Sequence, residues 1–82
     1  MQTAGRGRRG RQWETPPGAA LLCSVLLRPS IPPQNLNRLT MLGAVAVQHT
    51  LACWAPPDAL RIKWPNDVLL HGRKVAGILP EA

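Results

Sequence analysis

Four arginines lie close together near the start of the chain, within Gly5–Arg11 (GRGRRGR). The first thirteen residues carry a net charge of +4, whereas the other sixty-nine carry only +2. Because the positive charge is concentrated in this short segment, it indicates a binding site rather than a general property of the surface. Guanidinium groups pair well with phosphates and carboxylates. The segment therefore predicts binding of an anion, which the charge alone leaves open as nucleic-acid phosphate, a nucleotide, a carboxylate substrate or an anionic lipid.

Two nucleotide-binding patterns partly match this arginine-rich segment. Gly5, Gly7 and Gly10 fit G-x-G-x-x-G, but the sequence predicts no preceding strand, no following helix and no acid about 20 residues on, as that fold requires. A phosphate-binding P-loop needs Lys-Ser/Thr where this chain has Arg11-Gln12. Both matches are therefore rejected. An Arg/Gly-rich nucleic-acid-binding module and a solvated basic loop without function remain alternatives.

A second group of polar residues is Lys63-Trp-Pro-Asn-Asp67, followed by the basic pair Arg73-Lys74. An amide and a carboxylate next to a proline often serve only a turn, by bonding their own backbone. Basic side chains flank this turn, and the arginine-rich segment near the start of the chain is also basic. Two such neighbourhoods in one short chain favour a charge clamp around an anionic substrate.

Other catalytic arrangements find no support in the sequence. Cys23 and Cys53 lie apart in apolar surroundings, which predicts reduced, buried thiols rather than a zinc site or a disulfide. His49 and His71 are isolated, which is typical of helix-surface and turn residues. Ser24 has no partner base and lies in no nucleophile motif. We predict no protein metal site and no covalent catalysis.

The chain has 82 residues and a mass of 8.9 kDa, which limits it to one small domain. With 45% hydrophobic and 17% charged residues, it has the composition of a globular protein. Its longest apolar run, Met41 to Val47, is far shorter than a membrane span, and no hydrophobic signal segment follows the arginines. We expect a cytoplasmic protein without a membrane partner.

The elements that must position these residues follow from glycine, proline and hydrophobic spacing. Residues 1–18 read as a loop, and Ala19 to Leu27 as a strand covered on both faces. After the prolines at 29–33, Gln34 or Asn35 is expected to cap a helix that runs to about Cys53.

The last third of the sequence predicts strands. Leu60 to Trp64 alternates apolar and basic residues, so Arg61 and Lys63 should share one face of a strand. A second strand at 68–70 and a tight turn at 71–72 lead into a third strand at 73–79. We therefore predict an α+β fold in which a helix packs on a mixed sheet.

Several short segments stand out along the chain: QTAGRGRRGR at 2–11, Trp13, Pro16-Pro17-Gly18, Leu27-Arg28-Pro29, KWPNDV at 63–68 and GRKVAGIL at 72–79. Taken together, they closely resemble the catalytic domain of biotin protein ligases, in the family's order and over essentially the whole chain. The arginine-rich loop and the Lys63–Val68 segment favour biotin over lipoate, whose ligases share the fold and general chemistry.

The resemblance implies an ATP-dependent ligase that acts in two steps. The biotin carboxylate attacks the α-phosphate of ATP, which gives biotinyl-AMP and pyrophosphate, and a lysine of a biotin carboxyl carrier protein then accepts the biotinyl group. ATP and biotin are the implied small-molecule substrates, with Mg²⁺ accompanying ATP. No nucleic-acid partner is implied for this segment.

The resemblance also implies roles for individual residues. Lys74 would reach between the biotin carboxylate and the phosphate, where fixed cations lower the barrier between like charges. The residues implied as catalytic are Lys74, Arg8 and Lys63. Those implied to bind biotin are Gln2, Arg6, Gly7, Arg8, Lys74, Gly77 and Leu79, and those implied to bind the nucleotide are Gly5, Arg9, Arg11, Trp13, Asn66 and Asp67.

The chain also departs from the family's pattern. Family members carry earlier strands and a helix with a Thr-Asn type biotin-contacting motif, and they continue into a small C-terminal β-domain. Residues 1–82 are therefore expected to be a partial biotin/lipoate ligase catalytic domain. We expect the chain alone to bind biotin weakly or not at all, because its predicted strands would leave unpaired edges.

Overall fold

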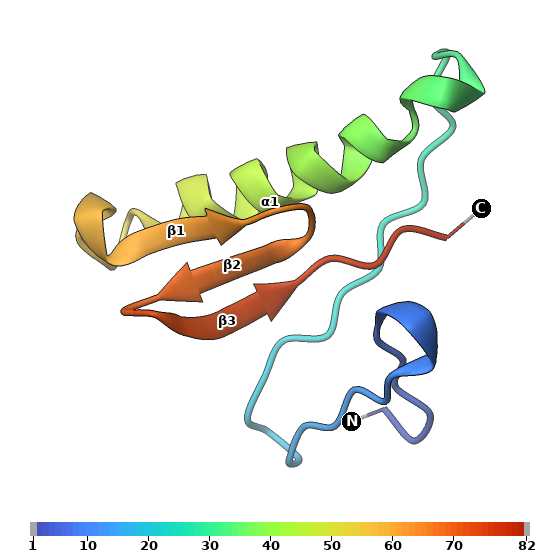
Figure 1. The fold of residues 1–82 in the computed structure, drawn as a ribbon. Helices are drawn as coiled ribbons and strands as arrows, with labels where there is room; N and C mark the ends of the chain where they lie inside the picture. The colour runs from blue at the N-terminus through green and yellow to red at the C-terminus, as the bar shows by residue number, and fades with distance from the viewer. Residues whose placement is uncertain (1, 82) are drawn as a thin grey trace. The chain divides into compact units, whose positions relative to one another are not determined.

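The structure is a computed structural model that describes residues 2–81. Its contacts divide the chain into two parts, Met1–Ser30 and Ile31–Ala82, and each is described by itself. The second part contains one α-helix and a three-stranded sheet (Figure 1). This arrangement confirms the α+β class.

The helix α1 spans Asn37–Leu51 and follows a 3₁₀ turn at Pro33–Asn35. The helix was expected to begin at a cap on Gln34 or Asn35, but Leu36 occupies the N-cap position. The reason is that Pro32 and Pro33 start the 3₁₀ turn, whose carbonyls accept bonds from Asn35 and Leu36. The turn thus leads directly into α1 and displaces its start by one or two residues.

Three short strands form the sheet: β1 is Leu60–Lys63, β2 is Asp67–Leu70 and β3 is Arg73–Gly77. They pair in the order β1-β2-β3 and antiparallel throughout, rather than in a mixed sheet, because hairpin turns connect them. His71 and Gly72 both have positive φ, 50° and 79°, as a two-residue hairpin turn requires. The predicted turn at 71–72 is confirmed.

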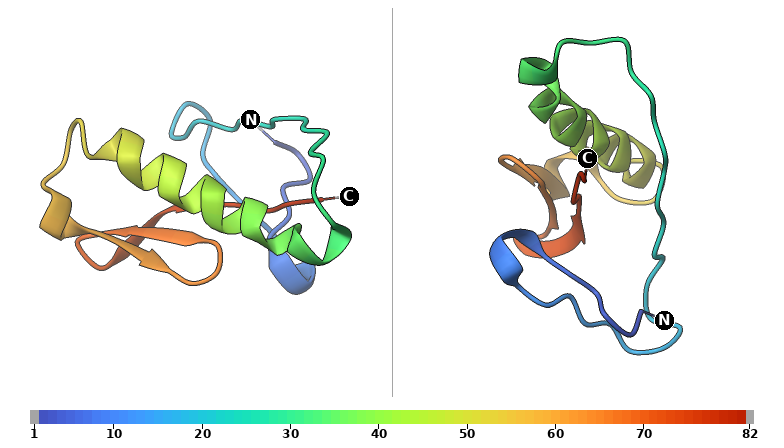
Figure 2. Two further views of the ribbon diagram at one scale, coloured as in Figure 1. Left: turned by 90° about the horizontal axis from the view of Figure 1, so that it is seen from above. Right: turned by 90° about the vertical axis from the view of Figure 1, so that its right-hand side faces the viewer.

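One face of the sheet packs against α1 (Figure 2). Leu60 and Val68 are buried there, together with Ala44 of the helix. Arg61 and Lys63 are exposed, which confirms the alternation predicted for β1. We call the sheet face turned away from α1 the open face.

Gly43 brings α1 close to the chain that follows β3. A side-chain carbon at Gly43 would lie 3.2 Å from Cγ2 of Ile78 and 3.4 Å from its Cγ1. An alanine there would be tight, and a larger side chain would have to displace Ile78.

We therefore expect Gly43→Leu to lower the free energy of unfolding by about 1–3 kcal/mol, the usual effect of overpacking. Urea denaturation of the 82-residue chain measures this. Val45→Leu is the matched control, because Val45 is 46% exposed on the same helix. Equal stability of the two variants would show that the contact with Ile78 does not limit packing.

The first part consists of loops around a 3₁₀ turn at Arg8–Gly10. Residues 19–27 were expected to be a buried strand, but the described part of the chain shows no strand there, and Leu21 and Leu26 are 90% and 84% exposed. A strand needs a paired neighbour to satisfy its backbone, and within residues 2–81 the paired strands are β1, β2 and β3, with one isolated bridge between Arg6 and Gln12. The strand prediction is wrong for this structure.

Two further expectations concern the burial of the two cysteines and the presence of a membrane-spanning helix. Cys23 and Cys53 are free thiols, as expected, but both are exposed rather than buried. Among residues 2–81, no helix is both long and apolar enough to cross a membrane.

Candidate functional site

Backbone hydrogen bonds close the arginine-rich segment into a compact loop. The amide of Trp13 donates to the carbonyl of Gly5 at 2.9 Å, and the amide of Gly7 donates to the carbonyl of Arg11. Arg9 and Gly10 have positive φ, 58° and 76°, which turns the chain back on itself. We call residues 5–13 the arginine loop. The side chains of its four arginines (Arg6, Arg8, Arg9 and Arg11) are exposed.

A pocket of about 380 Å³ lies beside the arginine loop. This pocket is shallow and open to solvent. The pocket is lined by Gln2, Gly5 and Trp13, among others. The family resemblance implies that Gln2 binds biotin and that Trp13 binds the nucleotide. The full lining is Gln2, Thr3, Ala4, Gly5, Gln12, Trp13, Glu14 and Thr15.

The structure makes Gly5 essential for closing the loop. A side-chain carbon at this position would lie 2.2 Å from the carbonyl oxygen of Trp13 and 2.8 Å from Oε1 of Gln2. The first of these atoms is backbone, so only a shift of the chain itself relieves the clash.

We expect Gly5→Ala to open the loop and to abolish the protection of the Trp13 amide against hydrogen exchange, since that amide bonds to Gly5. NMR detection of exchange measures the effect. Gly18→Ala is the control, because a side-chain carbon at Gly18 meets nothing within 4 Å, although its positive φ of 76°, which Gly5 does not have, makes alanine less favourable there. Unchanged protection in Gly5→Ala would contradict the loop geometry.

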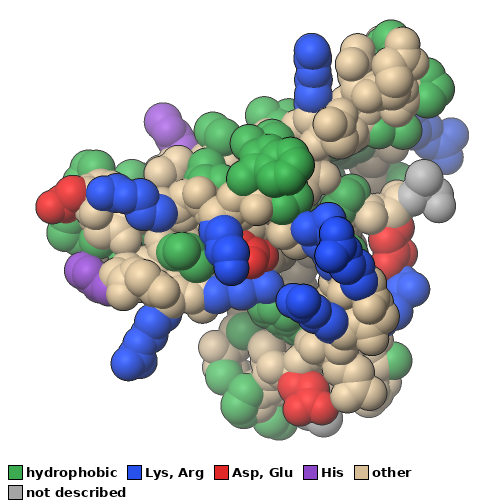
Figure 3. All heavy atoms as spheres, in the orientation of Figure 1, with side chains coloured by type: hydrophobic (Ala, Val, Ile, Leu, Met, Phe, Trp, Pro, Cys, Tyr) green, Lys and Arg blue, Asp and Glu red, His purple; other side chains and the backbone are tan. Residues whose placement is uncertain are grey.

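The second group of predicted residues lies on the open face of the sheet. The register pairs Lys63 of β1 with Asp67 of β2, and Asp67 with Gly77 of β3. Figure 3 shows an acidic side chain among Lys and Arg side chains on the sheet face toward the viewer. Lys63, Asp67 and Gly77 therefore share one stretch of this face.

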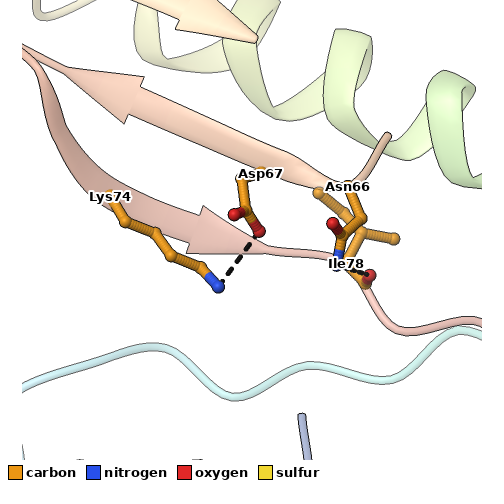
Figure 4. A network of polar contacts seen from close by, with 4 residues as sticks. All are labelled: Asn66, Asp67, Lys74 and Ile78. Atoms are coloured by element: carbon orange, nitrogen blue, oxygen red, sulfur yellow. Dashed lines mark hydrogen bonds and ion pairs between the residues drawn. The ribbon is translucent and has the colours of Figure 1, made fainter. Parts of the chain in front are cut away.

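Lys74 joins this stretch through an ion pair. Its Nζ lies 3.0 Å from Oδ1 of Asp67 (Figure 4). The Asp67 side chain is 18% exposed and that of Lys74 41% exposed, so the carboxylate is the more buried partner. The ammonium thus stays accessible to a further anion while it holds Asp67.

Asn66 ties the β1–β2 turn to the end of β3. Its Nδ2 donates to the carbonyl of Ile78 at 3.2 Å, and the amide of Ile78 donates to the Asn66 carbonyl at 2.9 Å (Figure 4). These two bonds hold the turn and the residue after β3 side by side, so the backbone that carries Asp67 is fixed relative to β3.

The predicted site residues fall into two groups, one in each part of the chain. The structure brings each group together internally. The first group, in and beside the arginine loop, is Gln2, Gly5, Arg6, Gly7, Arg8, Arg9, Arg11 and Trp13. The second, on and around the open face, is Lys63, Asn66, Asp67, Lys74, Gly77 and Leu79.

Sequence reasoning missed two features that shape the second group. One is the bond from Asn66 to Ile78, for which the sequence holds no clear signal. The other is a break in register between Val68 and Leu69, which leaves Val75 unpaired in β3. The adjacent apolar residues Val75 and Ala76 interrupt the alternation of β3, and this was the available signal.

Comparisons with known proteins agree with these motifs. The Biotin/lipoate A/B protein ligase family matches residues 1–82. A protein named Bifunctional ligase/repressor BirA from Bacillus subtilis is 48% identical over 98% of this chain and 24% of its own length. Biotin--[acetyl-CoA-carboxylase] ligase of Paracoccus denitrificans is 48% identical over 99% of this chain and 34% of its own length. Biotin--protein ligase of Homo sapiens is 36% identical over 95% of this chain and 11% of its own length.

The chain thus spans about a quarter of the length of the Bacillus relative and about a third of the Paracoccus one. No solved structure matches it. The family match, by contrast, covers every residue, and it includes both groups of site residues. The chain belongs to the biotin/lipoate A/B protein ligase family.

Proposed function

We propose that residues 1–82 supply part of the adenylation site of an ATP-dependent biotin protein ligase. The relatives' names point to biotin and to a carboxylase as the acceptor of the biotinyl group. The observation that carries the proposal is the closed arginine loop, which presents four exposed arginines beside a pocket lined by Gln2 and Trp13.

In the first step, an oxygen of the biotin carboxylate bonds to the α-phosphorus of ATP, and the bond from that phosphorus to pyrophosphate breaks. The reacting groups are both anions and repel each other. Fixed cations lower this barrier, because they need no reorganisation as charge develops. Arg8, Lys63 and Lys74 are the cations that we assign to the reacting groups.

In the second step, the amine of a carrier-protein lysine attacks the acyl carbon of biotinyl-AMP. An amide forms, AMP leaves, and the amine loses a proton. Water competes for the same acyl carbon, so the intermediate must be shielded until the carrier arrives. We assign this shielding to the arginine loop, whose bend at Arg9 and Gly10 lets it fold over a ligand.

The remaining residues divide between the two ends of the adenylate. Arginine suits both carboxylate and phosphate, which fits Arg6 near biotin and Arg9 and Arg11 near the nucleotide. We assign Gln2, Gly7, Gly77 and Leu79 to the biotin side, and Gly5, Trp13, Asn66 and Asp67 to the nucleotide side.

Mg²⁺ would enter this site with ATP. Within residues 2–81, no group of three or more His, Cys, Asp and Glu side chains is placed to hold a metal ion. Mg²⁺ is usually bound through one or two carboxylates together with substrate phosphates, and Asp67 is the carboxylate on the open face. When bound, Mg²⁺ would neutralise phosphate charge.

The proposal is tested in a full-length host. Residues 1–82 replace the matching stretch of the Paracoccus denitrificans ligase, which is 48% identical to them. We call this protein the chimeric ligase. We expect it to exchange labelled pyrophosphate into ATP only when biotin is present. A folded chimeric ligase that shows no such exchange, or that works equally with lipoate, would contradict the proposal.

A further inference from the structure

The register of β3 decides on which face Lys74 lies. Val68 pairs with Ala76, and both point toward α1. Regular alternation from Ala76 would pair Val75 with Leu69 and would place Lys74 on the helix side, opposite Leu70. Instead Leu69 pairs with Lys74, and Val75 is the extra residue of a β-bulge. The bulge therefore turns Lys74 onto the open face.

On the open face, Lys74 and Asp67 are diagonal neighbours rather than direct partners. Lys74 lies opposite Leu69, which is two residues along β2 from Asp67. Such diagonal positions are about 7–8 Å apart, a span that a lysine side chain can bridge. Figure 4 shows the Lys74 side chain extended along β3 toward Asp67, where its Nζ lies 3.0 Å from Oδ1.

The position of Asp67 itself is fixed. Its side chain is 18% exposed, and the bonds between the adjacent Asn66 and Ile78 hold its backbone against the end of β3. A lysine has several rotatable bonds and loses considerable rotamer entropy when it is ordered. Because the Asp67 carboxylate is fixed and lies within reach of the ammonium group, it restricts the motion of the Lys74 side chain before any substrate binds.

The chemistry of an ammonium group lets this contact persist during binding. An ammonium has three N–H donors and no acceptor. One donor can remain on Asp67 while the others bond to a substrate oxygen. The Lys74 side chain is 41% exposed, so a ligand in solution can reach the ammonium group.

We propose that Asp67 is a positioning residue that acts through Lys74: it holds the ammonium on the open face, aimed toward Gly77, ready for a substrate carboxylate or phosphate. The identity of that substrate rests on the proposed function. The ion pair and the bulge are observed in the structure and do not depend on the proposed function.

The first experiment uses the 82-residue chain without any ligand. NMR relaxation at ¹⁵Nζ measures how ordered each lysine side chain is. We expect Lys74 to be more ordered than the exposed Lys63, and Asp67→Asn to reduce the order of Lys74 to that of Lys63. Asp58→Asn, in the 3₁₀ turn before β1, is the control and should leave Lys74 unchanged. A Lys74 that is equally ordered in Asp67→Asn overturns the proposal.

The second experiment uses biotin-dependent pyrophosphate exchange by the chimeric ligase. We expect Asp67→Ala to lower kcat by about 10-fold or more with little change in the KM for biotin, because the ammonium is then misplaced when charge develops. Asp67→Glu, which keeps the carboxylate, should recover part of the loss. In the Lys74→Ala background, Asp67→Ala should cost less than it does alone, because the part of its effect that acts through Lys74 is already lost.

The outcomes separate the two proposals. A folded chimeric ligase that lacks exchange altogether contradicts the proposed function, and the NMR result alone then decides whether Asp67 orders Lys74. An active chimeric ligase in which the effects of Asp67→Ala and Lys74→Ala add independently overturns the positioning role, since Asp67 would then act by another route.

Discussion

Replacing Lys74 by alanine should lower the rate of biotin-dependent pyrophosphate exchange in the chimeric ligase by about 10²- to 10³-fold, the usual cost of removing one fixed donor to developing charge. The ammonium lies on the open face beside Asp67, and alanine would leave that carboxylate without its cation. Both the loss of the ammonium group and the carboxylate of Asp67, which would then lack this cation, make the site less favourable for a substrate carboxylate. The effect should appear mainly in kcat.

The neighbouring arginine provides the control for Lys74. Arg73 pairs with Leu70, which places it by register on the sheet face opposite to that of Lys74, and it is exposed. Arg73→Ala removes the same amount of charge one residue away and should change the exchange rate little. If the two variants lose activity equally, net charge rather than a positioned ammonium supports the reaction.

Replacing Arg8 by alanine should have the second large effect, a loss of about 10²-fold in the same exchange assay. Arg8 begins the 3₁₀ turn of the arginine loop, and its side chain is exposed. A guanidinium group can bond to two oxygens at once, which suits the bond between a carboxylate and a phosphate. Arg8→Lys should recover only part of the activity, since lysine lacks this fork.

Arg38 is the matched control for Arg8, because it is an exposed arginine on α1. Arg38→Ala should leave exchange unchanged. The loop must also stay closed in Arg8→Ala, which protection of the Trp13 amide reports. Full activity of a folded Arg8→Ala variant would remove Arg8 from the catalytic group.

Local features of the sheet could be predicted from the sequence. The alternation at 60–63 and the turn at 71–72 depend on neighbouring residues, and both are found as expected. Trp64, predicted to continue the buried face, lies after the end of β1 and is 73% exposed. The fate of residues 19–27 could not be predicted in the same way. An apolar run forms a strand only if a distant segment pairs with it, and the run itself does not specify that segment.

In the candidate site, too, some features could be predicted from the sequence and others could not. The residue types of the arginine loop and of the segment around Asp67 indicated an anion-binding function before any geometry was known. The face on which Lys74 lies depends on which residue of β3 is left unpaired. The adjacent Val75 and Ala76 signal that the alternation of β3 breaks, but they do not say which residue bulges. A one-residue change in register moves a side chain to the other face of the sheet.

The proposed function requires that, in the complete ligase, residues of the arginine loop and residues of the open face both respond to the same bound adenylate. Titration of the ¹⁵N-glycine-labelled chimeric ligase with a non-hydrolysable biotinyl adenylate tests it most directly. Gly7 reports on the loop and Gly77 on the strand opposite Asp67. The account predicts that both resonances shift with the same half-saturating ligand concentration. A shift of only one of them, or two different midpoints, would contradict it.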